Sequence, residues 1–196
     1  MRSLLPENVN TLLAFSDTIK GGISMSELSL LRSLLSYQAW ANEELLDSIG
    51  HLDPVRHGKE RHMAIRLMNH SHVVGRIFAA HLTGQEHGFA ADNTPDTPSL
   101  AELRTAVVSS DQWYLRYLET VSADLLAESL PFAFTDGDKG CMSRQEMLTH
   151  VVIHGGYHRG EIGRLLTQLS ITPPWDTFAV YLHRNEPSRR QAVAAE

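Results

Sequence analysis

The histidines are the residues of this sequence best suited to carry chemistry. Eleven occur among 196 residues, and His150, His154 and His158 follow one another at intervals of four. On an α-helix each step of four residues turns about 40° past a full circle, so neighbours at this spacing stack on one face. Two such imidazoles can bind one metal ion, as in helical zinc sites. His154 and His158 are therefore candidate metal ligands, whereas His150 lies two turns from His158, too far to share the ion.

Two glycines, Gly155 and Gly156, lie between the candidate ligands. Each costs a helix about 1 kcal/mol relative to alanine, so a helix with a purely structural role rarely keeps both. We therefore expect another helix or a ligand to approach the backbone closely at this point.

A third ligand must come from another element. The helical segment at residues 61–82 offers His62, His70, His72 and His81. His70 has apolar neighbours at helical spacings, whereas His72 lies about 200° further round the helix, near Asn69 and Arg76. Because metal sites in helical bundles use inward-facing side chains, we predict that His70 is the third ligand and that His72 faces a wetter surface. The residues alone leave open that these are ordinary core or surface histidines.

The elements that must position these residues are predicted to be helices. Four segments carry the 3.6-residue apolar period, and three of them open with Ser-x-x-Glu, a pattern in which both residues cap the helix. The capped segments follow Ser24, Ser99 and Ser143, and the uncapped one runs from about Arg61 to Gly84. We therefore predict an all-α fold, a four-helix bundle.

The connections refine this prediction. Residues 85–98 are rich in Gly, Pro, Asp and Asn and form one long crossover loop, long enough that we expect it to cover something. Asp136-Gly137 between two short runs predicts a small hairpin before the last helix. The expected organisation is an N-terminal arm or extension at residues 1–23, the bundle at 24–184 and a polar C-terminal tail at 185–196.

Composition excludes several classes of protein. Hydrophobic residues make up 42% and charged residues 20%, as in an ordinary globular protein. No apolar run approaches the roughly 20 residues of a transmembrane helix, so we expect no membrane partner. Seventeen Lys and Arg against 23 Asp and Glu give a net charge of -6 without a basic block, which argues against nucleic acid as a partner. The single cysteine, Cys141, excludes an internal disulfide and favours a cytoplasmic location.

Three separated motifs resemble the DinB/YfiT-like family of metal-binding proteins. The motifs are Tyr37-Gln-Ala-Trp40-Ala41-Asn42-Glu43, Leu67-Met-Asn69-His70 and His150-x3-His154-x2-Tyr157-His158-Arg159-Gly160-Glu161, and they lie in the family's order within residues 28–182. The resemblance implies a four-helix fold in which His70, His154 and His158 bind one divalent metal ion and leave positions open for water or substrate. The sequence departs from the family at Tyr157, where histidine is common, and at Glu161, where glutamine is common.

Further positions in these motifs carry weaker expectations. Glu161 lies one turn beyond His158, so we predict that it accepts a hydrogen bond from a metal-bound histidine or acts as an acid/base group. Asn42 is expected either to bond across helices or to line the site. Arg159 is expected to form a buried salt bridge or a helix cap, and Trp40 to pack in the core.

The ion determines what a three-histidine site can do. A divalent ion held by neutral imidazoles lowers the pKa of a bound water or thiol, and imidazole suits Zn, Ni, Fe or Cu without choosing among them. The resemblance implies a low-molecular-weight thiol as co-substrate, because relatives include S-transferases and isomerases that use such thiols in place of glutathione.

The favoured interpretation is a metal-dependent thiol S-transferase that conjugates such a thiol to an electrophilic small-molecule substrate. A metal-dependent hydrolase and a non-catalytic stress-response metal-binding dimer are the alternatives. The resemblance also implies a homodimer, which the aromatic residues Trp113, Tyr114 and Tyr117 support only weakly.

Overall fold

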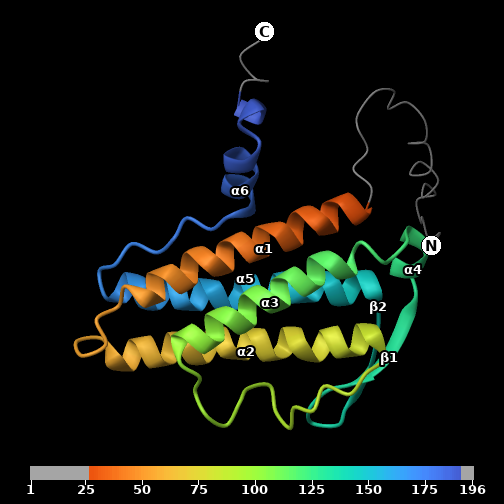
Figure 1. Cartoon of the computed structure of the whole chain (residues 1–196), viewed down its shortest axis with the longest axis horizontal. Helices are drawn as coiled ribbons and strands as arrows, with labels where there is room; N and C mark the ends of the chain where they lie inside the picture. The colour runs from red at the N-terminus through yellow and green to blue at the C-terminus, as the bar shows by residue number, and fades with distance from the viewer. Residues whose placement is uncertain (1–26, 191–196) are drawn as a thin grey trace, which may run out of the picture.

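Helices make up most of residues 27–190, the part of the chain that the computed structural model describes (Figure 1). The long helices are α1 (Glu27–Gly50), α2 (Gly58–Thr83), α3 (Leu100–Tyr117) and α5 (Arg144–Gln168). The shorter elements are α4 (Ala123–Leu126), β1 (Ser129–Ala133), β2 (Lys139–Ser143), α6 (Phe178–Asn185) and a 3-10 helix (Pro187–Arg190). The prediction of a mostly helical fold is confirmed. No helix within residues 27–190 is long and apolar enough to cross a membrane.

Capping residues set the ends of the helices. Ser99 and Ser143 each accept a hydrogen bond from the backbone N–H of the glutamate three residues on, and each glutamate bonds back, so both predicted capping boxes form. Gly84 ends α2 with a φ of 66°, a left-handed conformation that glycine adopts without strain. The expected arm at residues 1–23 and the expected cap at Ser24 lie outside the described residues, as does the expected tail beyond residue 190.

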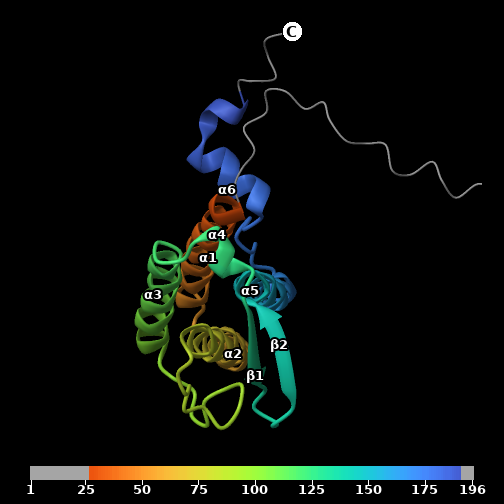
Figure 2. The same cartoon turned by 90° about the vertical axis from the view of Figure 1, so that its right-hand side faces the viewer.

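The hairpin and α6 flank the long helices. β1 and β2 pair antiparallel around a turn that contains Gly137, and Phe132 of β1 packs against Phe78 of α2 with ring centroids 5.7 Å apart. α6 lies against α1, with Tyr181 in ring contact with Tyr37 and Trp40, and projects away from α2 and α3 (Figures 1 and 2). Trp40 is therefore half-buried under α6 and is not a core residue, contrary to expectation.

A polar layer divides the interior between the long helices. The apolar cluster on the hairpin side includes Leu35, Phe78, Tyr114 and Leu148, and the cluster on the other side includes Leu46, Ile65, Leu103 and Ile162. Between the two clusters along the four helices lie the buried polar residues Gln38, Asn42, Asn69, Asp111 and Arg159. The three predicted metal ligands lie on α2 and α5 at the level of this layer.

Gly155 lets α1 and α5 approach closely at the polar layer. A β-carbon at this position would lie 3.0 Å from Oε1 of Gln38 on α1 and 3.1 Å from Nη1 of Arg159. The expected close approach is therefore present at Gly155. A β-carbon at Gly156 would meet its nearest atom, Nη2 of Arg159, at 3.7 Å, an ordinary van der Waals distance. Packing therefore requires only the first of the two glycines.

The two glycines should respond oppositely to alanine. Gly155→Ala is expected to destabilise the fold by about 1–2 kcal/mol, because Gln38 and Arg159 must shift to admit the methyl group. Gly156→Ala is expected to stabilise it by up to about 1 kcal/mol through helix propensity. Urea unfolding of both variants measures the difference. If Gly155→Ala stabilises as much as Gly156→Ala, the close-packing explanation is wrong.

Candidate metal centre

Two helices bring the three predicted ligands together. His70 projects from α2, His154 and His158 project from α5, and one ring nitrogen of each lies within 4.8 Å of the other two. The Nε2 atoms of His154 and His158 are 3.1 Å apart. Two nitrogens that each lie about 2.0–2.1 Å from one zinc ion are roughly 3.0–3.5 Å apart, so this spacing suits a shared ion. The three histidines are positioned to bind a metal ion.

Hydrogen bonds at the opposite ring nitrogens orient two of the three imidazoles. Nδ1 of His158 lies 2.6 Å from Oε2 of Glu161, and Nδ1 of His70 lies 2.8 Å from the backbone oxygen of Asp92. Because both oxygens accept, each Nδ1 carries the proton and each Nε2 keeps its lone pair for a metal ion. The structure thus places Glu161 as a hydrogen-bond acceptor for His158, and its acid/base role stays a prediction.

The environment of His154 keeps its imidazole neutral. Burial lowers the pKa of His154 to about 3, and the neighbouring charges of His158, His70 and His150 contribute in the same direction. A neutral ring is the form that binds metal, so no proton need be displaced from His154 at physiological pH. His150 packs between His154 and Phe78, with ring centroids 5.3 Å and 4.6 Å away respectively. It therefore belongs to the packing beside the three histidines.

The long loop between α2 and α3 secures the backbone acceptor of His70. Nδ2 of Asn69 donates to Oδ1 of Asn93 and to Oγ1 of Thr94, each at 2.6 Å. These bonds fix the loop immediately after Asp92, whose carbonyl accepts from His70. The loop that was expected to cover something therefore lies against α2 beside this histidine. Asp92, Asn93 and Thr94 were not predicted from the sequence, in which the loop's length was the only signal.

The three histidines are partly accessible to solvent. The side chains of His70 and His158 are 19% and 13% exposed, and the exposed ring of Tyr157 meets His158 edge-on with centroids 5.0 Å apart. Within residues 27–190 no fourth His, Cys, Asp or Glu joins the cluster. A metal ion held there would therefore keep room for a ligand from outside this set.

The expectation that His72 faces a wetter surface is wrong. Its Nδ1 is buried without a hydrogen-bond partner in the described part of the chain, and His72 lines a small cavity with Gln38, Asn42 and Asp111. Burial lowers the pKa of His72 to about 4, and the positive charge of Arg76 contributes to the shift. The expectation failed because α2 packs against α3 on one side and α5 on another, so it has two inward faces (Figure 2).

Asn42 bonds across helices in the polar layer. Its Nδ2 donates to Oδ2 of Asp111 on α3 at 3.0 Å, and its Oδ1 accepts from Nη1 of Arg159 on α5 at 3.1 Å. Arg159 is buried and forms the expected salt bridge, with Nε 3.1 Å from Oδ2 of Asp176. Burial raises the pKa of Asp111 to about 6, against the hydrogen bonds from Asn42 and Gln38. The network joins α1, α3 and α5 beside the histidines.

Comparison with known proteins shows the family to which the chain belongs. The sequence model of the DinB family matches residues 25–190. This chain belongs to the DinB family. It is also similar to Protein DinB of Bacillus subtilis (strain 168), with 25% identity over 160 residues that cover 76% of this chain and 91% of that protein. The family match includes all three histidines of the cluster and the loop that holds His70.

Single substitutions test the ligand set in this DinB family member. We expect the purified protein to carry about one divalent ion per chain, and His70→Ala, His154→Ala and His158→Ala each to lose most of it on dialysis, because two ligands bind too weakly. His72→Ala is the matched control: it removes a neighbouring buried histidine from the same helix and should keep the metal content within about twofold. Elemental analysis measures all four. Full metal content in His70→Ala, or loss in His72→Ala alone, would contradict the assignment.

Proposed function

We propose that this protein is a divalent-metal-dependent enzyme with its centre at His70, His154 and His158. The observation that carries the proposal is the convergence of three imidazoles without a fourth His, Cys, Asp or Glu ligand among residues 27–190. Structural zinc sites are typically closed by four protein ligands, whereas catalytic sites keep a position for water or substrate. Membership of the DinB family supports this proposal, and we extend it to a DinB-type four-helix bundle as the scaffold.

Neighbouring residues would orient the three histidines that hold the metal ion. A divalent ion bound by uncharged imidazoles supplies positive charge that lowers the pKa of a bound thiol or water, and zinc, nickel and iron all suit such ligands. Glu161 accepts a hydrogen bond from Nδ1 of His158, and the carbonyl of Asp92 accepts one from Nδ1 of His70, so Nε2 of each ring stays available for a metal ion. The low pKa of His154 keeps the third ring uncharged.

The reaction we favour conjugates a low-molecular-weight thiol to an electrophilic small molecule. The thiol sulfur forms a bond to an electrophilic carbon, the leaving group departs with the electron pair of the bond that breaks, and the thiol proton passes to solvent or to Glu161. The Glu161 side chain is 42% exposed and can return such a proton to water. Tyr157, which is exposed on α5 with its ring against that of His158, offers apolar surface to the electrophile.

The proposal also covers the cellular location and the oligomeric state of the enzyme. A lone cysteine, Cys141, needs no oxidising compartment, which supports a cytoplasmic location. We also propose a homodimer, the commonest state of soluble oligomers. The aromatic residues of α3 do not add support, because Tyr114 is buried in the core and Trp113 stacks on Tyr117 with centroids 5.2 Å apart.

A thiol-conjugation assay tests the reaction. Protein loaded with zinc, nickel or ferrous iron is mixed with a panel of low-molecular-weight thiols and chlorodinitrobenzene, and the absorbance of the conjugate is followed. We expect acceleration that a chelator removes and that His154→Ala lacks. Glu161→Gln should weaken metal affinity about 10–100-fold, because the carboxylate that orients His158 is gone, and should recover part of the rate at saturating metal.

Two results would contradict thiol transfer. Metal-dependent ester hydrolysis by the loaded protein without any thiol conjugation would favour a hydrolase that uses the same histidines. Full metal loading with neither activity would favour the non-catalytic metal-binding protein.

A further inference from the structure

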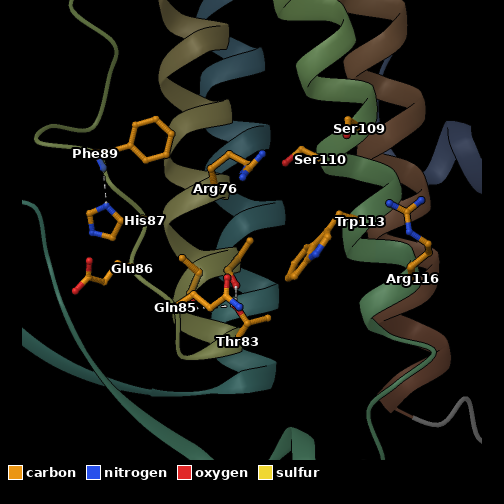
Figure 3. A pocket seen from close by; sticks show the side chains of 12 residues that line it. Arg76, Thr83, Gln85, Glu86, His87, Phe89, Ser109, Ser110, Trp113 and Arg116 are labelled. Carbon is orange, nitrogen blue, oxygen red and sulfur yellow. Dashed lines mark hydrogen bonds between the residues drawn. The ribbon is translucent and has the colours of Figure 1, made fainter.

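A second cavity lies between α2 and α3 under the start of the long loop (Figure 3). Its volume is about 300 Å³, at the lower end of the range for small-molecule sites. Side chains from all three segments line it, among them Arg76, His87, Phe89, Ser110, Trp113 and Arg116. None of the three clustered histidines lines this cavity, and nothing in the proposed metal chemistry uses it.

Arg76 supplies a positive charge that the described part of the chain does not neutralise. Arg76 is exposed, and no ion pair or hydrogen bond joins its guanidinium to another residue within 27–190. Figure 3 shows the side chain of Arg76 reaching from α2 toward Ser110 on α3. A planar guanidinium with free donors recognises a carboxylate through two parallel hydrogen bonds.

Ser110 provides a second donor on the opposite wall. The residue is 8% exposed, and its hydroxyl has no hydrogen-bond partner recorded among the described residues. A hydroxyl that borders a cavity and has no partner can donate a hydrogen bond to a ligand there. Arg76 and Ser110 thus present donors to the same space from two helices.

Aromatic rings form the apolar part of the cavity. Trp113 is partly buried and stacks on Tyr117, with their planes 15° apart and centroids 5.2 Å apart. Phe89 lies on the loop side, where its backbone N–H donates to Nδ1 of His87 at 3.1 Å. Aromatic faces favour a planar ring as the ligand's body. Glu86 also lines the cavity and disfavours a ligand with more than one negative charge.

We propose that this cavity binds a small aromatic monocarboxylate, with the carboxylate on Arg76 and Ser110 and the ring against Trp113. The ligand class follows from the pairing of the Arg76 guanidinium with an aromatic wall. Arg116 also lines the cavity, but Figure 3 shows its guanidinium pointing away from Arg76 and Trp113. Occupancy would also contact the loop residues that precede Asp92, the acceptor of His70. The site does not depend on a metal ion at the three histidines, so it can be tested separately from the proposed function.

Titration calorimetry with benzoate tests the proposal, with benzamide as the uncharged match and inorganic phosphate as a non-aromatic anion. We expect benzoate to bind and benzamide to bind at least about tenfold more weakly. Arg76→Gln should weaken benzoate binding by about tenfold or more, and Ser110→Ala by a few-fold. Arg164→Gln, which removes an exposed arginine on α5, is the matched control and should leave the affinity within about twofold.

Several outcomes would overturn this site. If benzamide binds as tightly as benzoate, the charge of the carboxylate is not recognised. If phosphate binds as tightly as benzoate, the aromatic wall does not contribute to affinity. Unchanged benzoate affinity in Arg76→Gln would remove the assigned donor. Benzoate binding that is lost in His154→Ala or with a chelator, and kept in Arg76→Gln, would place the carboxylate at the three histidines. Circular dichroism of each variant checks that it is folded.

Discussion

The packing of α2 against α5 is the constraint on which the candidate centre depends. It places one imidazole of α2 opposite two imidazoles of α5, so that a ring nitrogen of each lies within 4.8 Å of the others. Proximity of the three rings does not by itself direct a nitrogen lone pair toward a shared metal ion. The carboxylate of Glu161 and the backbone carbonyl of Asp92 supply the direction, because each accepts from the Nδ1 of one ring and leaves its Nε2 free. The long loop thus takes part in the site without contributing a ligand from its side chains.

The buried polar layer explains how the helices are held in register at the level of the histidines. A buried guanidinium is costly unless its hydrogen bonds and charge are satisfied. Arg159 meets this requirement with Asp176, Asn42 and the hydroxyl of Tyr37. Tyr37 and Asn42 belong to α1, and Asp176 belongs to the segment before α6. The network therefore specifies how α1 and α5 align. Gly155 belongs to the same arrangement, because a β-carbon there would crowd Gln38 and Arg159.

Local patterns predicted the parts of the structure that depend on local physics. The Ser-x-x-Glu motifs at Ser99 and Ser143 predicted two helix starts, because a capping box involves only four consecutive residues. The spacing of His154 and His158 predicted their shared face for the same reason. The Asp136-Gly137 pair predicted the hairpin, whose turn needs a residue that tolerates a positive φ, here 93° at Gly137.

The features that depend on long-range packing could not be predicted from local patterns in the sequence. The position of His72 was predicted wrongly because its neighbours suggested a wet surface, while α3 and α5 enclose α2 from two sides and one of those neighbours, Asn69, is only 3% exposed. The amide of Asn69 bonds to Asn93 and Thr94 of the loop, and Asn93 lies 24 positions further along the chain. Asp92 and Asp176 could not be found from motifs, because their roles arise only when the loop and the segment before α6 fold back onto the helices.

X-ray absorption spectroscopy at the edge of the bound metal distinguishes an open three-histidine centre from a closed one. For the zinc-loaded protein we expect three imidazole nitrogens at about 2.0–2.1 Å together with an exchangeable light-atom ligand, and fewer imidazole nitrogens on any zinc that His70→Ala retains. On addition of a low-molecular-weight thiol we expect one new sulfur at about 2.3 Å in place of that ligand. A spectrum with four protein ligands, or with fewer than three imidazoles in the unaltered protein, would contradict an open three-histidine centre.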